Sequence, residues 1–321
     1  MLIVHDIDSF EAPWDGAALT LGVFDGMHLG HNALIQALNS WSKTESLQRV
    51  MVTYHPHPDI VLGKRERWKG AELFTYPEKL ALLQAFELDA VIFLPFSREF
   101  ARMTAMRYLK SILLEKLKGR QIVIGYDQCF GRGRKGNFAF LQMFQKRYHY
   151  AVHRIDAVTM EDEIISSSQL RQLVQSGQID AANQRLGFCF FVSGTVVRGK
   201  SRGHQLGFPT ANLATPESKC IPGRGVYAAI ARFGSQTWRA MVNIGHNPTF
   251  GHQQLIIEAH LLGFEGDIYG ETLRLYFVKR LRDEQRFDSP NDLVQQLEKD
   301  KQETAKYVTD QILVSHLLMD K

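Results

Sequence analysis

The sequence contains few cysteines. Only three are present, Cys129, Cys189 and Cys220, an odd number without the spacing of a structural metal site. A disulfide framework and a cysteine-ligated zinc site are therefore not expected. This cysteine usage is typical of a reducing compartment, and we expect a cytoplasmic location.

Long apolar runs and strong charge are missing as well. No apolar segment approaches the length needed to span a bilayer, and the N-terminal Met-Leu-Ile-Val-His-Asp lacks the basic and apolar regions of an export signal. The formal net charge is only +4 over 321 residues, which is low for a nucleic-acid-binding protein. We expect small-molecule partners, with no nucleic acid and no membrane, and leave weak self-association open.

The P-loop pattern Gly-x-x-x-x-Gly-Lys-Ser/Thr is also absent, so any ATP must be held in another way. Residues 22–31 instead read Gly-Val-Phe-Asp-Gly-Met-His-Leu-Gly-His and follow an apolar run. A strand that ends at glycine and opens into a helix offers free N–H groups and a positive dipole end to a phosphate. If His28 begins that helix, His31 lies one turn later and both imidazoles share a face. Hydrogen-bond donors of this kind can stabilise the charge that develops as a bond to phosphorus forms. The alternative interpretation is a buried helix start in which the two histidines have no role in binding or catalysis.

The first half of the chain alternates expected strands and helices. Strands are predicted over 18–23, 49–54, 90–94 and 121–126, with helices over 32–40, 77–86 and 105–117. This alternation predicts an α/β domain with a mostly parallel, Rossmann-like sheet covered on both faces. Ligands bind beyond the carboxyl ends of such strands, which is where residues 22–31 would lie.

The second half of the chain has a different predicted secondary structure. Two short helices, 166–176 and 179–186, precede β-rich runs at 188–197, 225–233, 237–244, 255–262 and 272–278. Their spacing and the turns between them predict an antiparallel β-barrel or sandwich, and we expect the barrel. Ser289 followed by Pro290 predicts the start of a closing helix that runs to about residue 308. We therefore expect two domains, 1–186 and 187–321.

Two further segments of the first half could contact ligands. His55-Pro56-His57-Pro58 follows the second predicted strand, and without a third metal ligand it fits a rigid contact loop better than a metal site. Residues 166–168 are three serines at a helix start, with Arg171 one turn later. They either cap the helix or hold phosphate oxygens.

One basic, glycine-rich segment and one carboxylate stand out in the second half. Residues 199–212 form a glycine-rich loop that ends in Gly-Phe-Pro-Thr-Ala-Asn, either a flexible basic loop or a phosphate cradle. In the second case Thr210 and Asn212 could present oxygens to magnesium. Glu258 lies in an apolar, strand-like stretch, where a carboxylate is either a structural partner of an arginine or a general base.

Together these segments resemble the prokaryotic bifunctional family of riboflavin kinases and flavin adenylyltransferases (FAD synthetases). The resemblance rests on Gly-Val-Phe-Asp-Gly-x-His-x-Gly-His, Pro-His-Pro, residues 125–131, Ile-Ser-Ser-x-x-x-Arg and Gly-Phe-Pro-Thr-Ala-Asn, and it covers nearly the whole chain. It implies a nucleotidyltransferase domain that joins FMN to ATP, giving FAD and pyrophosphate, and a barrel domain that phosphorylates riboflavin with Mg-ATP. His28 and His31 would stabilise the reacting phosphates, and Glu258 would take the proton of the ribityl 5′-hydroxyl.

The resemblance also assigns binding residues. In the first domain they are Gly22, Phe24, Asp25, Gly26, His57, Asp127, Ser166, Ser167, Ser168 and Arg171. In the second they are Gly199, Lys200, Gly203, Gly207, Pro209, Thr210, Asn212 and Arg282, with Thr210 and Asn212 also at the magnesium.

The sequence departs from the family pattern at a few positions. Gln128 replaces a usual aromatic residue, and His246 and Asn247 stand where basic residues are common. Three alternatives stay open: an adenylyltransferase for another mononucleotide or a pantetheine-type substrate, a non-catalytic flavin-binding regulator, and an aminoacyl-tRNA synthetase. The first leaves Glu258 unexplained, the second requires lost catalytic residues, and the third lacks a tRNA-binding region.

Overall fold

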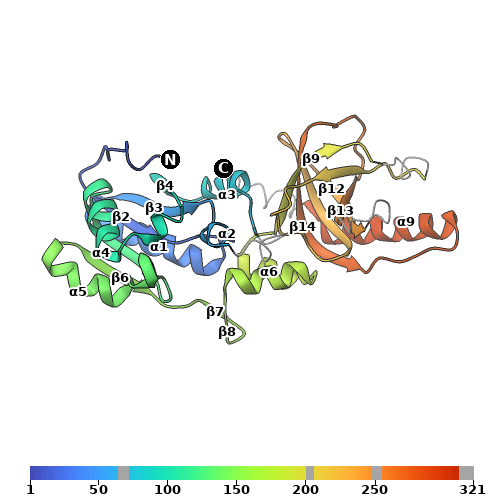
Figure 1. The fold of residues 1–321 in the computed structure, drawn as a ribbon. Coiled ribbons are helices and arrows are strands. Elements are labelled where there is room, and N and C mark those ends of the chain that lie inside the picture. Colours follow the sequence, from blue (N-terminus) through green and yellow to red (C-terminus); the bar gives the residue numbers. More distant parts are fainter. Residues whose placement is uncertain (64–71, 200–205, 247–254, 311–321) are drawn as a thin grey trace. The chain divides into compact units, whose positions relative to one another are not determined.

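A computed structural model describes residues 1–63, 72–199, 206–246 and 255–310 (Figure 1). The chain divides into two compact units. The first comprises Met1–Trp68 and Leu80–Ser166, and the second comprises Lys69–Lys79 and Ser167–Lys321. The second unit therefore includes the two short helices that precede the barrel and a segment taken from the first half of the sequence.

The first unit is built on a parallel sheet in the order β1-β4-β3-β2-β5-β6. Its strands are β1 Leu2–Val4, β2 Ala17–Leu21, β3 Gln48–His55, β4 Ala90–Pro95, β5 Gly119–Gly125 and β6 Ala151–Ile155. The chain order reverses between β2 and β5, and doubly wound sheets bind ligands beyond the carboxyl ends of the strands at that point. The loop after β2 carries the glycine–histidine segment. The predicted α/β fold is confirmed.

Helices accompany this sheet in the sequence. They are α1 Leu29–Thr44, α2 Pro58–Val61, α3 Tyr76–Leu83, η2 Phe100–Arg102, α4 Ala105–Arg107, η3 Tyr108–Lys116, η4 Arg132–Arg134 and α5 Phe138–Tyr148. The helix predicted over 105–117 is present, although after one α-turn it becomes the π-helix η3. Two pairs of buried residues, Tyr108 with Leu113 and Ile112 with Leu117, lie five positions apart, which suits the wider π-turn.

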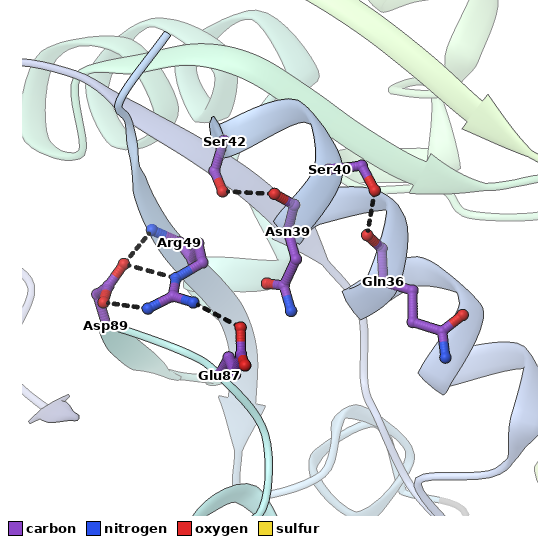
Figure 2. Close-up of polar contacts among 7 residues, drawn as sticks. All are labelled: Gln36, Asn39, Ser40, Ser42, Arg49, Glu87 and Asp89. Atoms are coloured by element: carbon purple, nitrogen blue, oxygen red, sulfur yellow. Dashed lines mark hydrogen bonds and ion pairs between the residues drawn. The ribbon is translucent and has the colours of Figure 1, made fainter. Parts of the chain in front are cut away.

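Helix α1 extends to Thr44, past the predicted end at residue 40. Hydroxyl groups in its last turns bond back to the helix: Ser40 donates to the Gln36 carbonyl at 3.0 Å, and Ser42 to the Asn39 carbonyl at 2.9 Å (Figure 2). Such bonds satisfy a serine inside a helix, so the buried Ser42 does not end it.

A bidentate ion pair joins the first residues of β3 to the segment that leads into β4 (Figure 2). Arg49 donates to the Asp89 carboxylate through Nε at 3.0 Å and Nη2 at 2.8 Å, and its Nη1 reaches Glu87 at 3.1 Å. The Asp89 carboxylate also accepts the Arg49 backbone N–H. The hydrogen bond from the Arg49 side chain is the largest cause that lowers the pKa of Asp89 below its ordinary value.

We predict that Arg49→Met lowers the free energy of unfolding at pH 7 by about 1–2 kcal/mol, because a partly buried, bidentate, charge-assisted pair is lost. Because the folded state depresses the pKa of Asp89, this stabilisation is present above the ordinary aspartate pKa of about 4 and disappears as the pH falls below it. Urea denaturation at pH 7 and pH 3 measures the difference. Arg154→Met, which removes an exposed pair with Asp156, is the control and should change little. An equal loss at both pH values would contradict the prediction.

The second unit contains a closed antiparallel barrel in the order β10-β13-β12-β11-β14-β9. Its strands are β9 Phe191–Val197, β10 Ala211–Ala214, β11 Gly225–Phe233, β12 Gln236–His246, β13 Leu255–Leu261 and β14 Thr272–Arg282. The predicted barrel is confirmed, although the four-residue β10 was not predicted. The small β7 (Thr159–Met160) and β8 (Glu163–Ile164) hairpin lies in the first unit.

The described part of the second unit contains the helices α6 Ser167–Gln175, α7 Ile179–Leu186 and α9 Pro290–Tyr307. Helix α9 begins as predicted, with the Ser289 hydroxyl accepting from the Asp292 N–H at 3.2 Å and proline at the first helical position. It packs on β11, β12 and β14. The predicted closing helix is confirmed.

A buried charge lies in the core of the second unit. The Lys219 side chain is fully enclosed, and its Nζ lies 2.9 Å from the Glu78 carboxylate. The ammonium also donates to the carbonyl oxygens of Leu73 and Phe191, and Glu78 accepts the Ser193 N–H at 2.6 Å. The ion pair therefore attaches the 72–79 segment to the start of the barrel.

Candidate active sites

The loop after β2 has an unusual backbone. Phe24 and Met27 adopt positive φ angles of 48° and 47°, and Gly26 lies between them at 101°. Residues other than glycine are costly in this region, and such conformations cluster at ligand-binding loops. Both side chains are almost completely buried, so packing holds the loop in place. The Gly22 N–H donates to the Val52 carbonyl at 3.0 Å and fixes the start of the loop at β3.

His28 and His31 lie side by side at the start of α1. His28 is the N-cap residue, and the two imidazole rings stack at a centroid distance of 3.8 Å with planes 17° apart. They share a face, as the spacing predicts. A Cβ atom on Gly30 would lie 3.1 Å from the His28 ring, so glycine at this position leaves room for the imidazole.

Burial sets the charge of His28. Desolvation lowers its pKa to about 4, against the opposing effect of the nearby Asp25 carboxylate, so the ring is neutral at pH 7. Its buried Nδ1 has no hydrogen-bond partner among the described residues. A buried polar atom of this kind needs an explanation, and a bound ligand would supply one. The residues present therefore fit a phosphate group at this loop.

The serine segment begins beside the same turn. The Ile165 carbonyl oxygen would lie 4.0 Å from a Cβ on Gly30, so the chain just before Ser166 runs next to the histidine loop within the first unit. Ser167 and Ser168 then open α6. Arg171 Nη1 lies 3.4 Å from Ser168 Oγ, so these two side chains share a helical face. Ser168 and Arg171, two of the phosphate-binding residues proposed from the sequence, therefore lie on the same face of α6.

The remaining predicted residues of the first unit lie near the ends of β3 and β5. His57 caps α2, and its Nδ1 accepts the Asp59 N–H at 3.1 Å, which leaves Nε2 as the protonated nitrogen of the neutral ring. Asp127 is exposed in the turn after β5. Gln128 is half-buried, and its side-chain amide donates to the neighbouring Cys129 carbonyl at 3.4 Å.

The barrel brings three polar side chains into one row. Glu258 on β13 pairs in register with Asn212 on β10 and with Asn243 on β12. Residues in register on antiparallel strands project to the same face. All three are partly exposed, whereas the neighbouring Ile257 and Ala259 are buried, so the row is the polar face of an alternating pattern.

The glycine-rich loop contacts this row directly. A Cβ atom on Gly199 would lie 2.1 Å from the Asn212 side-chain nitrogen, so glycine at this position leaves room for the amide, which a larger residue would displace. Gly207 has a φ of 79° and permits the turn that leads to Thr210. Lys200 and Gly203 lie outside the described residues, as do Asn247 and the segment 248–251.

The donor set suits a hard cation held with a nucleotide. Thr210 offers a hydroxyl oxygen and Asn212 an amide oxygen. Among the described residues, no three His, Cys, Asp or Glu side chains come together in a way that could hold a metal ion without a nucleotide. Magnesium bound with ATP keeps several waters and takes only one or two protein ligands besides the phosphates. The residues present fit such an ion.

Arg282 is held by the closing helix. Its guanidinium makes a bidentate pair with Asp300 on α9, with Nε–Oδ1 at 3.0 Å and Nη2–Oδ2 at 2.7 Å, and Gln296 donates to the same carboxylate. Asp300 is almost fully buried. The pair attaches β14 to α9, and the contact of Arg282 with the flavin stays a prediction.

The sequence analysis assigned no role to Asn243. Only the register of β12 with β13 places Asn243 opposite Glu258. Strand register between separate segments cannot be read from either segment alone. A polar residue inside an otherwise apolar strand was the one available signal.

These features define a two-domain transferase that handles nucleotides. The family description for FAD synthetase matches residues 11–169, and that for riboflavin kinase matches residues 186–308. The bifunctional riboflavin kinase/FMN adenylyltransferase of Bacillus subtilis is 31% identical over 300 residues, which cover 92% of this chain and 93% of the relative. The corresponding Escherichia coli K12 protein is 32% identical over 298 residues, covering 92% and 94%. The chain belongs to the bifunctional riboflavin kinase/FMN adenylyltransferase family.

Among solved structures, a Streptococcus pneumoniae crystal structure described as a macrolide-efflux protein is similar to this chain. Its TM-score is 0.87 at 29% identity, covering 96% of this chain and 100% of that one. Within the described residues, no helix of this chain has the length and apolar character needed to cross a membrane.

The chain is an enzyme with two transferase activities. It phosphorylates riboflavin to FMN and adenylylates FMN to FAD, so riboflavin and FMN are substrates and FAD is the final product.

Proposed function

We propose that residues 1–186 carry the adenylyl transfer and residues 187–321, with the barrel, carry the kinase step, with ATP as the co-substrate of both and Mg²⁺ bound with ATP at the barrel. The match to riboflavin kinase from residue 186 supports a functional boundary between 186 and 187, although helices α6 and α7 group with the second compact unit. A cytoplasmic location also stays a prediction.

In the adenylyl transfer, the FMN phosphate attacks the α-phosphorus of ATP, a new P–O–P bond forms, and pyrophosphate leaves. No side-chain nucleophile is needed, because FMN supplies the attacking oxygen. His28 and His31 donate hydrogen bonds to the phosphate oxygens on which charge increases. The neutral state of His28 makes it a fixed donor that can gain a proton when a polyanion binds nearby.

Other residues of the first domain hold the substrates. The backbone of the loop formed by Gly22, Phe24, Asp25 and Gly26 lets the triphosphate approach closely. Ser166, Ser167, Ser168 and Arg171 bind the other phosphate oxygens through hydroxyls, N–H groups and the guanidinium. His57 and Asp127 lie at the FMN side, with Gln128 in place of an aromatic contact.

In the kinase step, Glu258 accepts the proton of the riboflavin 5′-hydroxyl as that oxygen attacks the γ-phosphorus. Thr210 and Asn212 hold Mg²⁺, which neutralises charge on the phosphates when it is bound. The glycines at 199, 203 and 207, with Lys200 and Pro209, form the phosphate cradle, and Arg282 lies toward the flavin. The register of Asn212 with Glu258 is the observation that carries this proposal.

A product assay tests both steps together. The protein is incubated with riboflavin, ATP and Mg²⁺, and flavins are separated by chromatography over time. FMN should appear first and FAD later. FMN alone would place the failure in the first domain, with Gln128 as the first residue to examine. The absence of any flavin product would overturn the proposal.

We predict that His28→Ala lowers the rate of FAD formation from FMN about 10²–10³-fold, because one donor to the transition-state oxygens is lost. Riboflavin phosphorylation by the same protein should be unchanged. His5→Ala, which removes an exposed histidine of the same unit, serves as the control. Equal loss of both activities would contradict a role confined to adenylyl transfer.

A further inference from the structure

His260 lies on the strand that carries Glu258 and contacts the nucleotide turn. It follows Glu258 by two residues on β13, and side chains at this spacing share a face of a strand. Its Nδ1 lies 2.7 Å from the Pro209 carbonyl oxygen. Its ring also meets Phe208 edge-on, with ring centroids 5.2 Å apart and planes at 61°. One imidazole therefore joins the strand of the base to the turn that precedes Thr210.

The hydrogen bond fixes the tautomer of His260. A carbonyl oxygen only accepts, so Nδ1 must carry the proton. Desolvation is the largest effect and lowers the pKa of His260, while the hydrogen bond to Pro209 raises it in part. The neighbouring α9 charges, Lys301 and Glu298, act in opposite directions. The ring is therefore neutral near pH 7 and keeps a single proton on the nitrogen that faces Pro209. This arrangement suits a fixed structural link and not an acid that exchanges its proton.

The position of this bond matters because of peptide geometry. The Pro209 carbonyl and the Thr210 N–H belong to one planar peptide unit, so holding the oxygen also orients Thr210. Phe208 is almost fully buried, which anchors the other side of the turn. Gly207, by contrast, has no atom within 4 Å of the place where a Cβ would stand. The turn is thus held at Phe208 and Pro209, and His260 contacts both.

We propose that His260 is a positioning residue of the kinase site, which sets the placement of Thr210 relative to Glu258 by holding the Pro209–Thr210 peptide against β13. This inference rests on the proposed roles of Thr210 with Mg-ATP and of Glu258 as the base. His260 itself touches no reacting atom.

Three substitutions separate the hydrogen bond from packing. His260→Phe keeps a ring against Phe208 and removes the donor. His260→Asn keeps an N–H group near the position of Nδ1, and His260→Gln places the donor one bond farther away. For each variant, kcat and KM for MgATP and for riboflavin are measured, with FMN adenylylation by the same protein as an internal control.

His260→Phe should raise KM for MgATP about three- to tenfold, the equivalent of one net hydrogen bond, and leave KM for riboflavin and FMN adenylylation unchanged. His260→Asn should restore most of the parental KM, and His260→Gln should fall between the two. If His260→Phe does not fold, the proposal is still tested by comparing KM for MgATP in His260→Asn and His260→Gln, of which the Asn variant should have the lower value. In a double-mutant cycle, the effects of His260→Phe and Thr210→Ala on KM should be less than additive.

A parental KM for MgATP in His260→Phe, or an Asn variant as impaired as the Phe variant, would overturn the inference. Fully additive effects of His260→Phe and Thr210→Ala would overturn it as well. An error in the proposed function gives a different result from an error in the inference about His260. If Glu258 is not the base, Glu258→Gln phosphorylates riboflavin at the parental rate, whichever residue stands at position 260.

Discussion

Glu258→Gln should lower kcat for riboflavin phosphorylation about 10²–10⁴-fold, the range of a lost general base. Glutamine keeps the shape of the side chain and its hydrogen-bonding capacity toward Asn212 and Asn243, the two residues in register with it. It cannot take the proton of an alcohol at neutral pH. The measurement is the initial rate of FMN formation from riboflavin at saturating Mg-ATP.

Two controls accompany this variant. FMN adenylylation should continue at the parental rate, because the histidine loop lies in the other compact unit. Glu271→Gln, an exposed glutamate of the second unit, should leave both activities unchanged. If Glu258→Gln forms FMN at the parental rate, the assignment of the base is wrong.

Lys219→Met should lower the free energy of unfolding of the second unit by about 3–5 kcal/mol, because it leaves Glu78 buried without its countercharge. The three ammonium protons of Lys219 match three acceptors, the Glu78 carboxylate and the carbonyls of Leu73 and Phe191. The ammonium also lies 4.7 Å and 4.6 Å from the ring centroids of Phe74 and Phe190. The urea midpoint for loss of riboflavin kinase activity measures the effect.

The double variant Lys219→Met/Glu78→Gln should recover part of this loss, since no uncompensated charge remains. Lys306→Met, which removes an exposed pair with Glu303, should shift the midpoint very little. A single variant as stable as the parent, or a double variant less stable than the single one, would contradict the account of the buried pair.

Local patterns predicted much of this molecule. Alternating elements indicated the parallel sheet, and the spacing of His28 and His31 indicated a shared face that the stacked rings confirm. The predictions omitted the eleven-residue helix α5 and the strand β6. They also omitted β1 and β10, which have three and four residues, too few to show a hydrophobic period. The π type of η3 could not be predicted, because buried apolar positions four residues apart suit an α-helix as well as a π-helix.

Contacts between distant segments could not be predicted. The bond between Lys219 and the Leu73 carbonyl spans 146 residues, and no property of either segment indicates the other. The same holds for His260 with Pro209 and for Arg282 with Asp300. In each case the residue types were compatible with many partners, and only the folded chain pairs them.

The placement of the 72–79 segment also has a consequence for the order of folding. Both ends of Lys69–Lys79 continue into the first unit, while its buried partners belong to the second. During synthesis Leu73 is added 146 residues before Lys219, so Phe74 and Glu78 lack this buried partner while the first sheet can already form. The core of the second unit is therefore completed late, by a segment that was made early.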